Sequence, residues 1–437
     1  MSAPAKTRVP ALVYPSETGS GFGIIRCLDG QDIFITGLNG RKAFTRFSRR
    51  FKSLLCPSPE SDGDGETFIE FLLRWGEKNG PAALFIADDL ASFLVSKNQA
   101  RLKKFFYYPY QSDKAVLGGL DKWMMYETAR QCAIPVPESI LARKPEDLSQ
   151  LGPEFHWPLV IKPVVSRFVI DGDSATNAYA FRKIFGYARA VRASNRAELE
   201  RLTAKIFPES IEILIQEEVP GNCDRLYTYN FYVNKKNEIS PGSCHRKIRQ
   251  VPADFGITSV GDCVEAGVME NYTRDFVRAI DFHGMGSIEF KKDAVTGEYK
   301  LIEINPRPPH SILHATSSGC NFILAQYLDL VEGRALALTP KPGRELWFHL
   351  EGDLQYLASN CWDKKSPYYV SFFQWFGIFT GKPVVEAFLS RRDWLMNAVY
   401  VWRSLSRFLR KFVQNLILHW TGFKVSHKGM QKAKNAS

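Results

Sequence analysis

Two acidic side chains and one amide stand in neighbouring apolar segments of the sequence. Glu289 and Glu303 each lie between two apolar residues, and the charged, glycine-containing stretch KKDAVTGEYK that separates the segments predicts a hairpin. Because strand side chains alternate, Glu303 and Asn305 share one face of the second strand. Carboxylate and amide oxygens that converge in this way suit Mg²⁺, and Arg307 follows closely enough to meet a phosphate. A half-exposed hairpin with solvated acids is the alternative interpretation of this segment.

Three earlier segments carry side chains that suit a nucleotide. Lys122 follows Asp121, which can cap a helix that ends before Pro135. Lys162 stands at the end of the short apolar strand predicted in WPLVIKPVVS. The apolar segment IEILIQEEVPG, residues 211–221, runs into two acids and a Pro-Gly turn. Lysines beside strands are common, so the information lies in the order and spacing of the whole set.

This ordered set, between residues 114 and 335, resembles the ATP-grasp superfamily, whose metal-binding end has the pattern E-(hairpin)-ExNPR. The resemblance implies that Lys122 and Lys162 bind the α- and β-phosphates of ATP as point charges. It also implies two Mg²⁺ ions, or Mn²⁺ in their place, held by Glu289, Glu303 and Asn305. In ATP-grasp ligases the γ-phosphoryl group goes to a carboxylate, and an amine then attacks the acyl phosphate. Such chemistry needs positioning and positive charge more than a protein nucleophile.

By the same resemblance, residues 216–219 form the hinge between the two lobes of the nucleotide-binding fold. Backbone groups from Gln216 to Val219 would read the adenine edge, and either Glu217 or Glu218 would accept hydrogen bonds from the ribose hydroxyls. The family also has a mobile loop over the phosphates, for which Gly172, Asp173 and Ser174 are suited, and a third cation after it. Lys183 and Arg189 both qualify for that third cation.

A basic cluster follows the hinge. The RKxRQxPxxFG run, residues 246–256, resembles the carboxylate–amine ligase branch, which includes D-aspartate ligase-like members. The resemblance implies that Arg249, and after it Arg246, holds the acceptor carboxylate or the γ-phosphate, since bidentate recognition of a carboxylate suits arginine. Lys247 would lie on the substrate side. A solvated basic turn is the alternative.

The resemblance also implies the architecture, an α/β chain with an α+β ATP-grasp core. Residues 1–113 form a pre-ATP-grasp domain with a parallel sheet. Residues 114–340 form the two-lobed ATP-grasp domain, with lobes at about 114–210 and 211–340. Residues 341–397 form a carboxy-terminal elaboration, and residues 398–437 a basic helical extension.

Within the first domain, the glycines of TGSGFG are expected to shape the substrate side rather than to bind a dinucleotide, because an isolated GxGxG is a weak signal. Asp88 and Asp89 follow an apolar strand, where α/β sheets place ligands. Asp89 is expected to cap the next helix, and Asp88 is a candidate for the substrate amine. His310 and His314 are expected to have a structural or substrate-side role.

Composition limits the partners and the compartment. The net charge of +11 is concentrated in residues 391–437, which hold ten lysines and arginines against one aspartate. A nearly neutral body with a basic end argues against a nucleic-acid-binding protein. The eight cysteines are scattered without a CxxC pair, and no signal-peptide pattern is found, so we expect a cytoplasmic protein without disulfides or zinc.

Residues 398–420 place apolar side chains at helical spacing among several arginines. Basic amphipathic helices can lie on anionic membranes, so peripheral contact with the inner face of a membrane is one interpretation. An ordinary terminal helix packed on the body or on a second subunit is the other. Residues 424–437 are expected to be disordered. Dimers are common in the superfamily, so a homodimer is compatible with the resemblance.

Taken together, the sequence predicts an ATP-dependent carboxylate–amine ligase that forms an amide through an acyl phosphate and releases ADP and phosphate. Its partners would be a small carboxylate and an amine, with an amino acid or peptide among them. An ATP-grasp carboxylase or kinase-like enzyme is an alternative, although no biotinyl-carrier motif is visible. A nucleotide-binding regulatory or scaffold protein, docked through its basic tail, is an alternative of another class.

Overall fold

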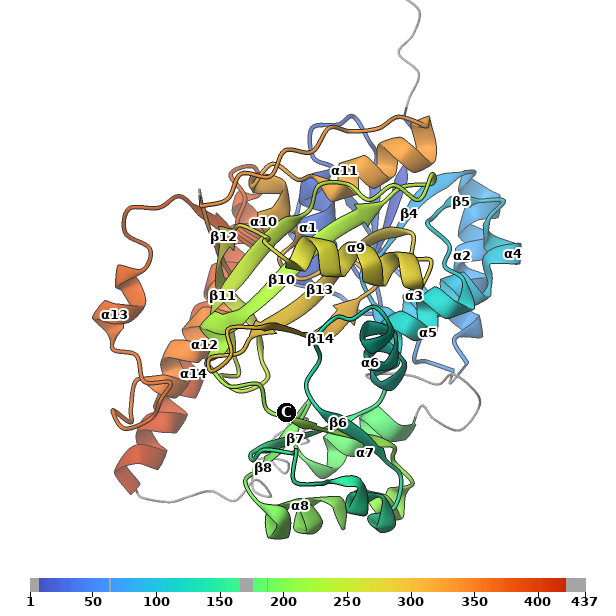
Figure 1. Ribbon diagram of the computed structural model, residues 1–437. Helices are drawn as coiled ribbons and strands as arrows, with labels where there is room; N and C mark the ends of the chain where they lie inside the picture. Colours follow the sequence, from blue (N-terminus) through green and yellow to red (C-terminus); the bar gives the residue numbers. More distant parts are fainter. Residues whose placement is uncertain (1–7, 63, 166–175, 187, 344, 422–437) are drawn as a thin grey trace, which may run out of the picture.

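The computed structural model describes residues 8–62, 64–165, 176–186, 188–343 and 345–421. Its strands form three sheets, and Figure 1 shows the smallest of them, with β6, β7 and β8, set apart below the other two. The predicted mobile loop at residues 172–174 and the predicted disordered tail at 424–437 lie outside the described residues.

The amino-terminal sheet is parallel, as predicted, with the order β3-β2-β1-β4-β5. Strands β1, β2 and β4 are buried along their whole length, which is expected when helices cover both faces of a parallel sheet. The strands are β1 Ala11–Tyr14, β2 Ile35–Asn39, β3 Lys52–Leu55, β4 Ala82–Ile86 and β5 Phe106–Tyr107; the helices are α1 Gly19–Cys27, η1 Phe44–Phe47, α2 Glu66–Asn79, α3 Asp89–Lys97 and α4 Gln99–Leu102.

The small lobe is an antiparallel sheet with the order β6-β9-β7-β8. One apolar cluster, which includes Phe181, Leu199 and Ile213, joins the sheet to its two helices. The elements are β6 Ser139–Ala142, η2 Pro145–Gln150, β7 Leu159–Pro163, α7 Thr176–Ile184, β8 Val191–Ala193, α8 Arg196–Thr203, η3 Phe207–Glu209 and β9 Ile213–Glu217.

The large sheet has the order β14-β13-β10-β11-β12-β15-β16, and its core packs against α5, α6 and α9. The predicted hairpin is present as β13 and β14. The strands are β10 Leu226–Val233, β11 Ser243–Val251, β12 Ile257–Val264, β13 Gly284–Lys292 and β14 Tyr299–Asn305. The helices are α5 Asp113–Leu120, α6 Lys122–Gln131 and α9 Met269–Ala279, and a short 3₁₀ helix, η4 Cys223–Arg225, precedes β10.

The segment expected to close the core as one helix is interrupted. It forms α10 Ile312–Ser317, α11 Phe322–Tyr327 and a π-helical turn, η5 Leu328–Glu332. The break is at Gly319, whose φ of 96° is rarely adopted by residues with a side chain. A Cβ on Gly319 would also lie 2.1 Å from the carbonyl oxygen of Thr339. A close backbone approach from the next segment therefore ends the first helix.

The carboxy-terminal region adds to the large sheet rather than forming a separate layer. β15 (Leu346–Phe348) pairs antiparallel with β12, and β16 (Val384–Glu386) pairs parallel with β15. The same region contains three helices: α12 Leu350–Asn360 and α13 Phe372–Gly377 lie between the two strands, and α14 Trp394–Thr421 follows them. In Figure 1, α12, α13 and α14 lie together at one side of the large sheet.

The last helix begins at Trp394, four residues before the predicted start. Asp393, directly before it, has a fully buried side chain that accepts hydrogen bonds from Ser48 Oγ and Arg50 Nε, each at 2.9 Å. This contact fixes the start of α14 against the amino-terminal domain. Because its residues are distant in the chain, no local sequence pattern predicts the contact. Within the described residues, α14 and the other helices are all too short or too polar to span a bilayer.

Candidate active site

A cavity of about 560 Å³ is lined by all three parts of the fold. The small lobe contributes residues of β7, β8 and β9, the large sheet contributes β10 to β14, and the amino-terminal domain contributes the ends of β1 and β4. Side chains that the sequence placed in one site therefore meet in one space.

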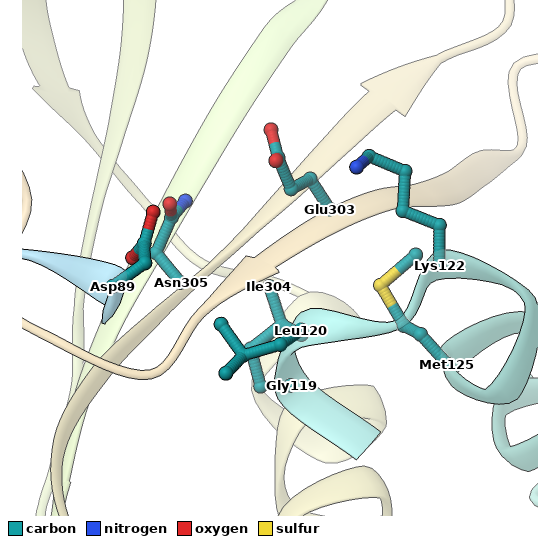
Figure 2. A pocket seen from close by; sticks show the side chains of 8 residues that line it. All are labelled: Asp89, Gly119, Leu120, Lys122, Met125, Glu303, Ile304 and Asn305. Atoms are coloured by element: carbon teal, nitrogen blue, oxygen red, sulfur yellow. The ribbon is translucent and has the colours of Figure 1, made fainter. Parts of the chain in front are cut away.

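The two carboxylates lie directly across the hairpin. Glu289 on β13 is in register with Glu303 on β14, and Asn305 lies two residues further on the same face. All three line the cavity, and Figure 2 shows Glu303 and Asn305 extending from β14 toward the space that Lys122 and Asp89 also face. Across the sheet, Lys247 Nζ lies 3.0 Å from Glu289 Oε2.

This donor set fits a magnesium ion bound partly by its substrate. Within the described residues no three acidic, histidine or cysteine side chains are grouped as a complete metal cage. Mg²⁺ is commonly held by one or two carboxylates together with substrate phosphates and water. Two carboxylates and one amide, open to a cavity lined by lysines, match that mode of binding.

The two lysines both line the cavity and are both buried. Lys122 begins α6, where Asp121 caps the helix by accepting hydrogen bonds from two backbone amides. Lys162 lies near the end of β7, with Nζ 3.3 Å from Tyr126 Oη. Burial, reinforced by the neighbouring charge of Lys122, lowers the pKa of Lys162 to about 7, and burial also lowers the pKa of Lys122. Phosphate groups in the cavity would compensate both charges.

The two adjacent glutamates of the hinge have side chains in different surroundings. Glu218 lines the cavity, whereas Glu217 accepts hydrogen bonds from the backbone and ring nitrogens of His156, both at 2.8 Å. Gln216 lines the cavity and accepts a hydrogen bond from Tyr126 Oη at 3.0 Å. Val219 also lines it. The geometry therefore favours Glu218 over Glu217 for contact with a bound ribose.

Sequence reasoning missed a network that joins the small lobe to the large sheet. Arg192 of β8 donates to Glu218 and, at 3.1 Å, to Asp254 in the turn between β11 and β12. Tyr368 of the carboxy-terminal region donates to the same Asp254 oxygen. The hydrogen bond to Glu218 raises the pKa of Arg192. A cation between the apolar Val191 and Ala193 was the local signal, but the partners are distant in sequence.

Of the two candidates for the third cation, Arg189 lines the cavity, whereas Lys183 is exposed and is not part of the described cavity lining. Arg182, which directly precedes Lys183, also lines the cavity. Neighbouring residues of a helix point about 100° apart, so α7 directs Arg182 inward and Lys183 outward. Sequence spacing could not choose between two adjacent cations.

The prediction that Asp89 caps the helix after β4 is wrong, because Asp88 occupies that position. Asp88 caps α3, where it accepts a hydrogen bond from the amide of Ala91 at 3.0 Å. Asp89 begins the helix, is buried, and forms a two-point ion pair with Arg307. The helix begins one residue earlier than expected, at Asp89, so the extended Asp88 occupies the capping position. Both aspartates line the cavity.

In the basic cluster of β11, Lys247 faces the cavity and the two arginines do not belong to its described lining. Arg246 pairs with Asp262, with Nη2 and Oδ2 2.7 Å apart. Arg249 is buried and donates to both carboxylate oxygens of Asp353 on α12. Irregular register on both sides of Arg249 interrupts the alternation of the strand. The expectation that Arg249 or Arg246 contacts a substrate is therefore not supported by their positions.

The glycine-rich turn shapes the end of the cavity near the amino-terminal domain. A Cβ on Gly19 would lie 1.9 Å from Cε1 of His310, so glycine allows α1 to approach the loop after β14. Thr18, Ser20 and His310 line this end of the cavity. Burial lowers the pKa of His310 well below its usual range, which keeps the imidazole neutral at physiological pH. His314 is buried in α10 and has a structural position.

Comparison with known proteins finds similarity both in sequence and in fold. No family model matches the sequence. The sequence is 24% identical over 295 residues to a D-aspartate ligase of Enterococcus faecium, an alignment that covers 63% of this chain and 66%, slightly under two thirds, of the relative.

Two solved structures show the same fold. An L-amino acid ligase from Bacillus licheniformis has a TM-score of 0.56 at 15% identity, covering 77% of this chain and 78% of its own. The biotin carboxylase domain of a Hydrogenobacter thermophilus 2-oxoglutarate carboxylase, in complex with MgADP, has a TM-score of 0.57 at 13% identity, covering 78% and 74%. The chain shares its fold with these two enzymes. Its similarity in sequence to the D-aspartate ligase and in fold to the L-amino acid ligase relates it to the ATP-grasp carboxylate–amine ligases.

Proposed function

We propose that the protein is an ATP-dependent ligase that joins a carboxylate to an amine through an acyl phosphate. The observation that carries the proposal is a single cavity, which is lined by Glu218, by Lys162 and Lys122, by the hairpin acids and by the Asp89–Arg307 pair. Phosphate-binding cations, oxygen donors for Mg²⁺ and a separate end suited to a second substrate thus share one space.

In this proposal Lys122 and Lys162 bind the α- and β-phosphates, and Glu218 binds the ribose. Bound Mg²⁺ would neutralise charge on the β- and γ-phosphates, with Glu289, Glu303 and Asn305 as its protein ligands. The burial of both lysines supports this role, because charges removed from water interact strongly with a nucleotide.

The reaction would occur in two steps, phosphoryl transfer to the acid and attack of the amine. A substrate carboxylate oxygen attacks the γ-phosphorus of ATP, and the bond from that phosphorus to the leaving oxygen of ADP breaks. The amine nitrogen then attacks the acyl carbon, phosphate leaves with the bonding electron pair, and the nitrogen loses a proton. Lys247 and Arg307, which both line the cavity, are positioned to balance the negative charge of these groups.

The cavity end near the amino-terminal domain is proposed to take the carboxylate and amine substrates. Thr18 and Ser20 offer hydroxyl groups, and Asp88 and Asp89 offer carboxylates that suit an amine. The likeness to two amino-acid ligases supports an amino acid or a peptide as one substrate.

The proposal is tested by measuring ADP release from MgATP with a panel of amino acids and dipeptides, with hydroxylamine present as a general amine. A hydroxamate product together with ADP, dependent on one acid, is expected. AMP and pyrophosphate as products would contradict phosphoryl transfer to the acid.

The metal ligands are tested by Glu303→Ala, for which we expect turnover to fall by about a hundredfold or more while nucleotide binding is partly retained. Glu298→Ala is the matched control, because Glu298 is exposed in the turn of the same hairpin. Unchanged turnover in Glu303→Ala would refute the metal assignment.

A further inference from the structure

The last helix, α14, is held to the body of the protein by one face. Arg403 and Arg407 both pair with Glu351 of α12. Further along, Phe412 packs on Trp362 with ring centroids 4.6 Å apart, and the Asn415 amide donates to the carbonyl of Ala358 at 2.8 Å. These contacts extend over most of the helix, so its orientation on the body is fixed.

The opposite face of α14 is apolar and faces outward. Its exposed side chains are Leu395, Trp402, Leu405, Leu409, Val413 and Ile417. Their spacing of seven, three, four, four and four residues places them along one side of a helix. At 1.5 Å per residue the stripe is about 33 Å long. Trp402, at 75% exposure, and Trp394, at 64%, stand where an amphipathic ring can meet an interface.

Charge decides which partner suits this stripe. The 28 residues of α14 contain four arginine and lysine residues and no acidic residue. Arg410 is exposed beside the stripe, and the exposed Arg391 and Arg392 precede the helix. A second copy of α14 would bring cations against cations, which is unfavourable. An anionic surface with an apolar interior matches both the stripe and its flanks.

We propose that the outward face of α14 binds the surface of a lipid bilayer that contains anionic headgroups. The helix lies in the plane of the membrane, its apolar stripe reaches the acyl-chain boundary, and the flanking cations contact the headgroup phosphates. The inner face remains packed on α12, so the whole protein is attached without a spanning segment. This inference does not depend on the proposed reaction.

The experiment measures co-sedimentation of the full chain with vesicles of phosphatidylcholine and phosphatidylglycerol in equal parts, and with vesicles of phosphatidylcholine alone. We expect binding to the anionic vesicles that weakens as salt is raised. In the double variant Trp402→Glu, Leu409→Glu, binding should fall more than tenfold. The variant loses two apolar side chains that the bilayer would bury, and it gains two negative charges that the anionic headgroups repel.

The matched control is Val295→Glu. Val295 is 81% exposed in the turn between β13 and β14, so this variant adds a charge at an exposed apolar position away from α14. We expect it to bind vesicles as the unmodified chain does. Circular dichroism of both variants checks that each remains folded, which is expected because all three positions are exposed.

Three outcomes would overturn the proposal. The first is absence of binding to anionic vesicles, and the second is equal binding to both vesicle types. The third is a dimer of the unmodified chain, seen by sedimentation velocity, that dissociates in the double variant while vesicle binding is unaffected. That last result would assign the stripe to contact between two copies.

Discussion

Replacing Lys162 by methionine should stabilise the nucleotide-free protein at neutral pH while weakening ATP binding. Lys162 is buried beside Tyr126, and its pKa is lowered from 10.5 to about 7 by burial and by the charge of Lys122. Methionine occupies a similar volume without a charge, so it removes the cost of keeping an ammonium group away from water.

The size of the effect depends on pH in a defined direction. Between pH 7 and 10.5 the unfolded chain holds a proton on Lys162 that the folded chain has released, so the stability of the unmodified protein rises with pH. Each pH unit in this window changes the unfolding equilibrium up to about tenfold. From pH 7 to pH 9 the advantage of the Lys162→Met variant should therefore shrink by roughly 2 kcal/mol, because half of the folded molecules still hold the proton at pH 7. Below about pH 6, where both states hold the proton, the advantage should be constant.

The assay is urea unfolding of both proteins at pH 6, 7, 8 and 9 at constant ionic strength. Lys236→Met is the control, because Lys236 is exposed in the turn after β10 and should show no comparable dependence. A stability difference that does not change with pH, or a variant less stable throughout, would refute the reasoning. In the same protein, isothermal titration should show weaker ATP binding.

Two further predictions follow from the neighbouring contacts. Glu218→Ala should weaken ATP binding about tenfold, whereas Glu217→Ala, which removes a contact with His156 outside the cavity, should leave the dissociation constant nearly unchanged in the same titration. Equal effects would contradict the assignment of the ribose ligand. Asp353→Ala should lower the free energy of unfolding by about 3–5 kcal/mol in urea, because it leaves the Arg249 guanidinium buried without its partner. A loss below about 1 kcal/mol would show that this pair is not structural.

Local patterns were sufficient to predict the hairpin that carries Glu289 and Glu303. Alternation along a strand fixes which residues share a face, and a short glycine-containing turn fixes the pairing of its two strands. The presence of the hairpin thus follows from about twenty contiguous residues, whereas the alignment of Glu289 with Glu303 also depends on an irregularity in the pairing between Glu289 and Phe290. The cap at Asp121 was predicted for the same reason, because it depends on a signal within one segment. The parallel amino-terminal sheet was implied by the family resemblance.

Contacts between distant segments account for what the sequence did not predict. Arg249 has the residue type expected of a carboxylate ligand, but an irregularity in β11 and the presence of Asp353 on α12 direct it into the core. Arg192 was overlooked because Asp254 and Tyr368 come from other parts of the chain. Bulges and long-range ion pairs are selected by packing, for which local sequence has no periodic signature.

The sequence by itself carried the resemblance to the ATP-grasp class and the chemical types expected in the site, because those depend on the identity and order of the residues. It predicted that residues near 398–420 form an amphipathic helix with cationic flanks. Only the tertiary structure decided which side of that helix packs on α12 and which side faces outward, and which cations line the cavity. The physical reason is that an apolar stripe is equally suited to a core and to a membrane until the remaining chain has packed against one of its faces.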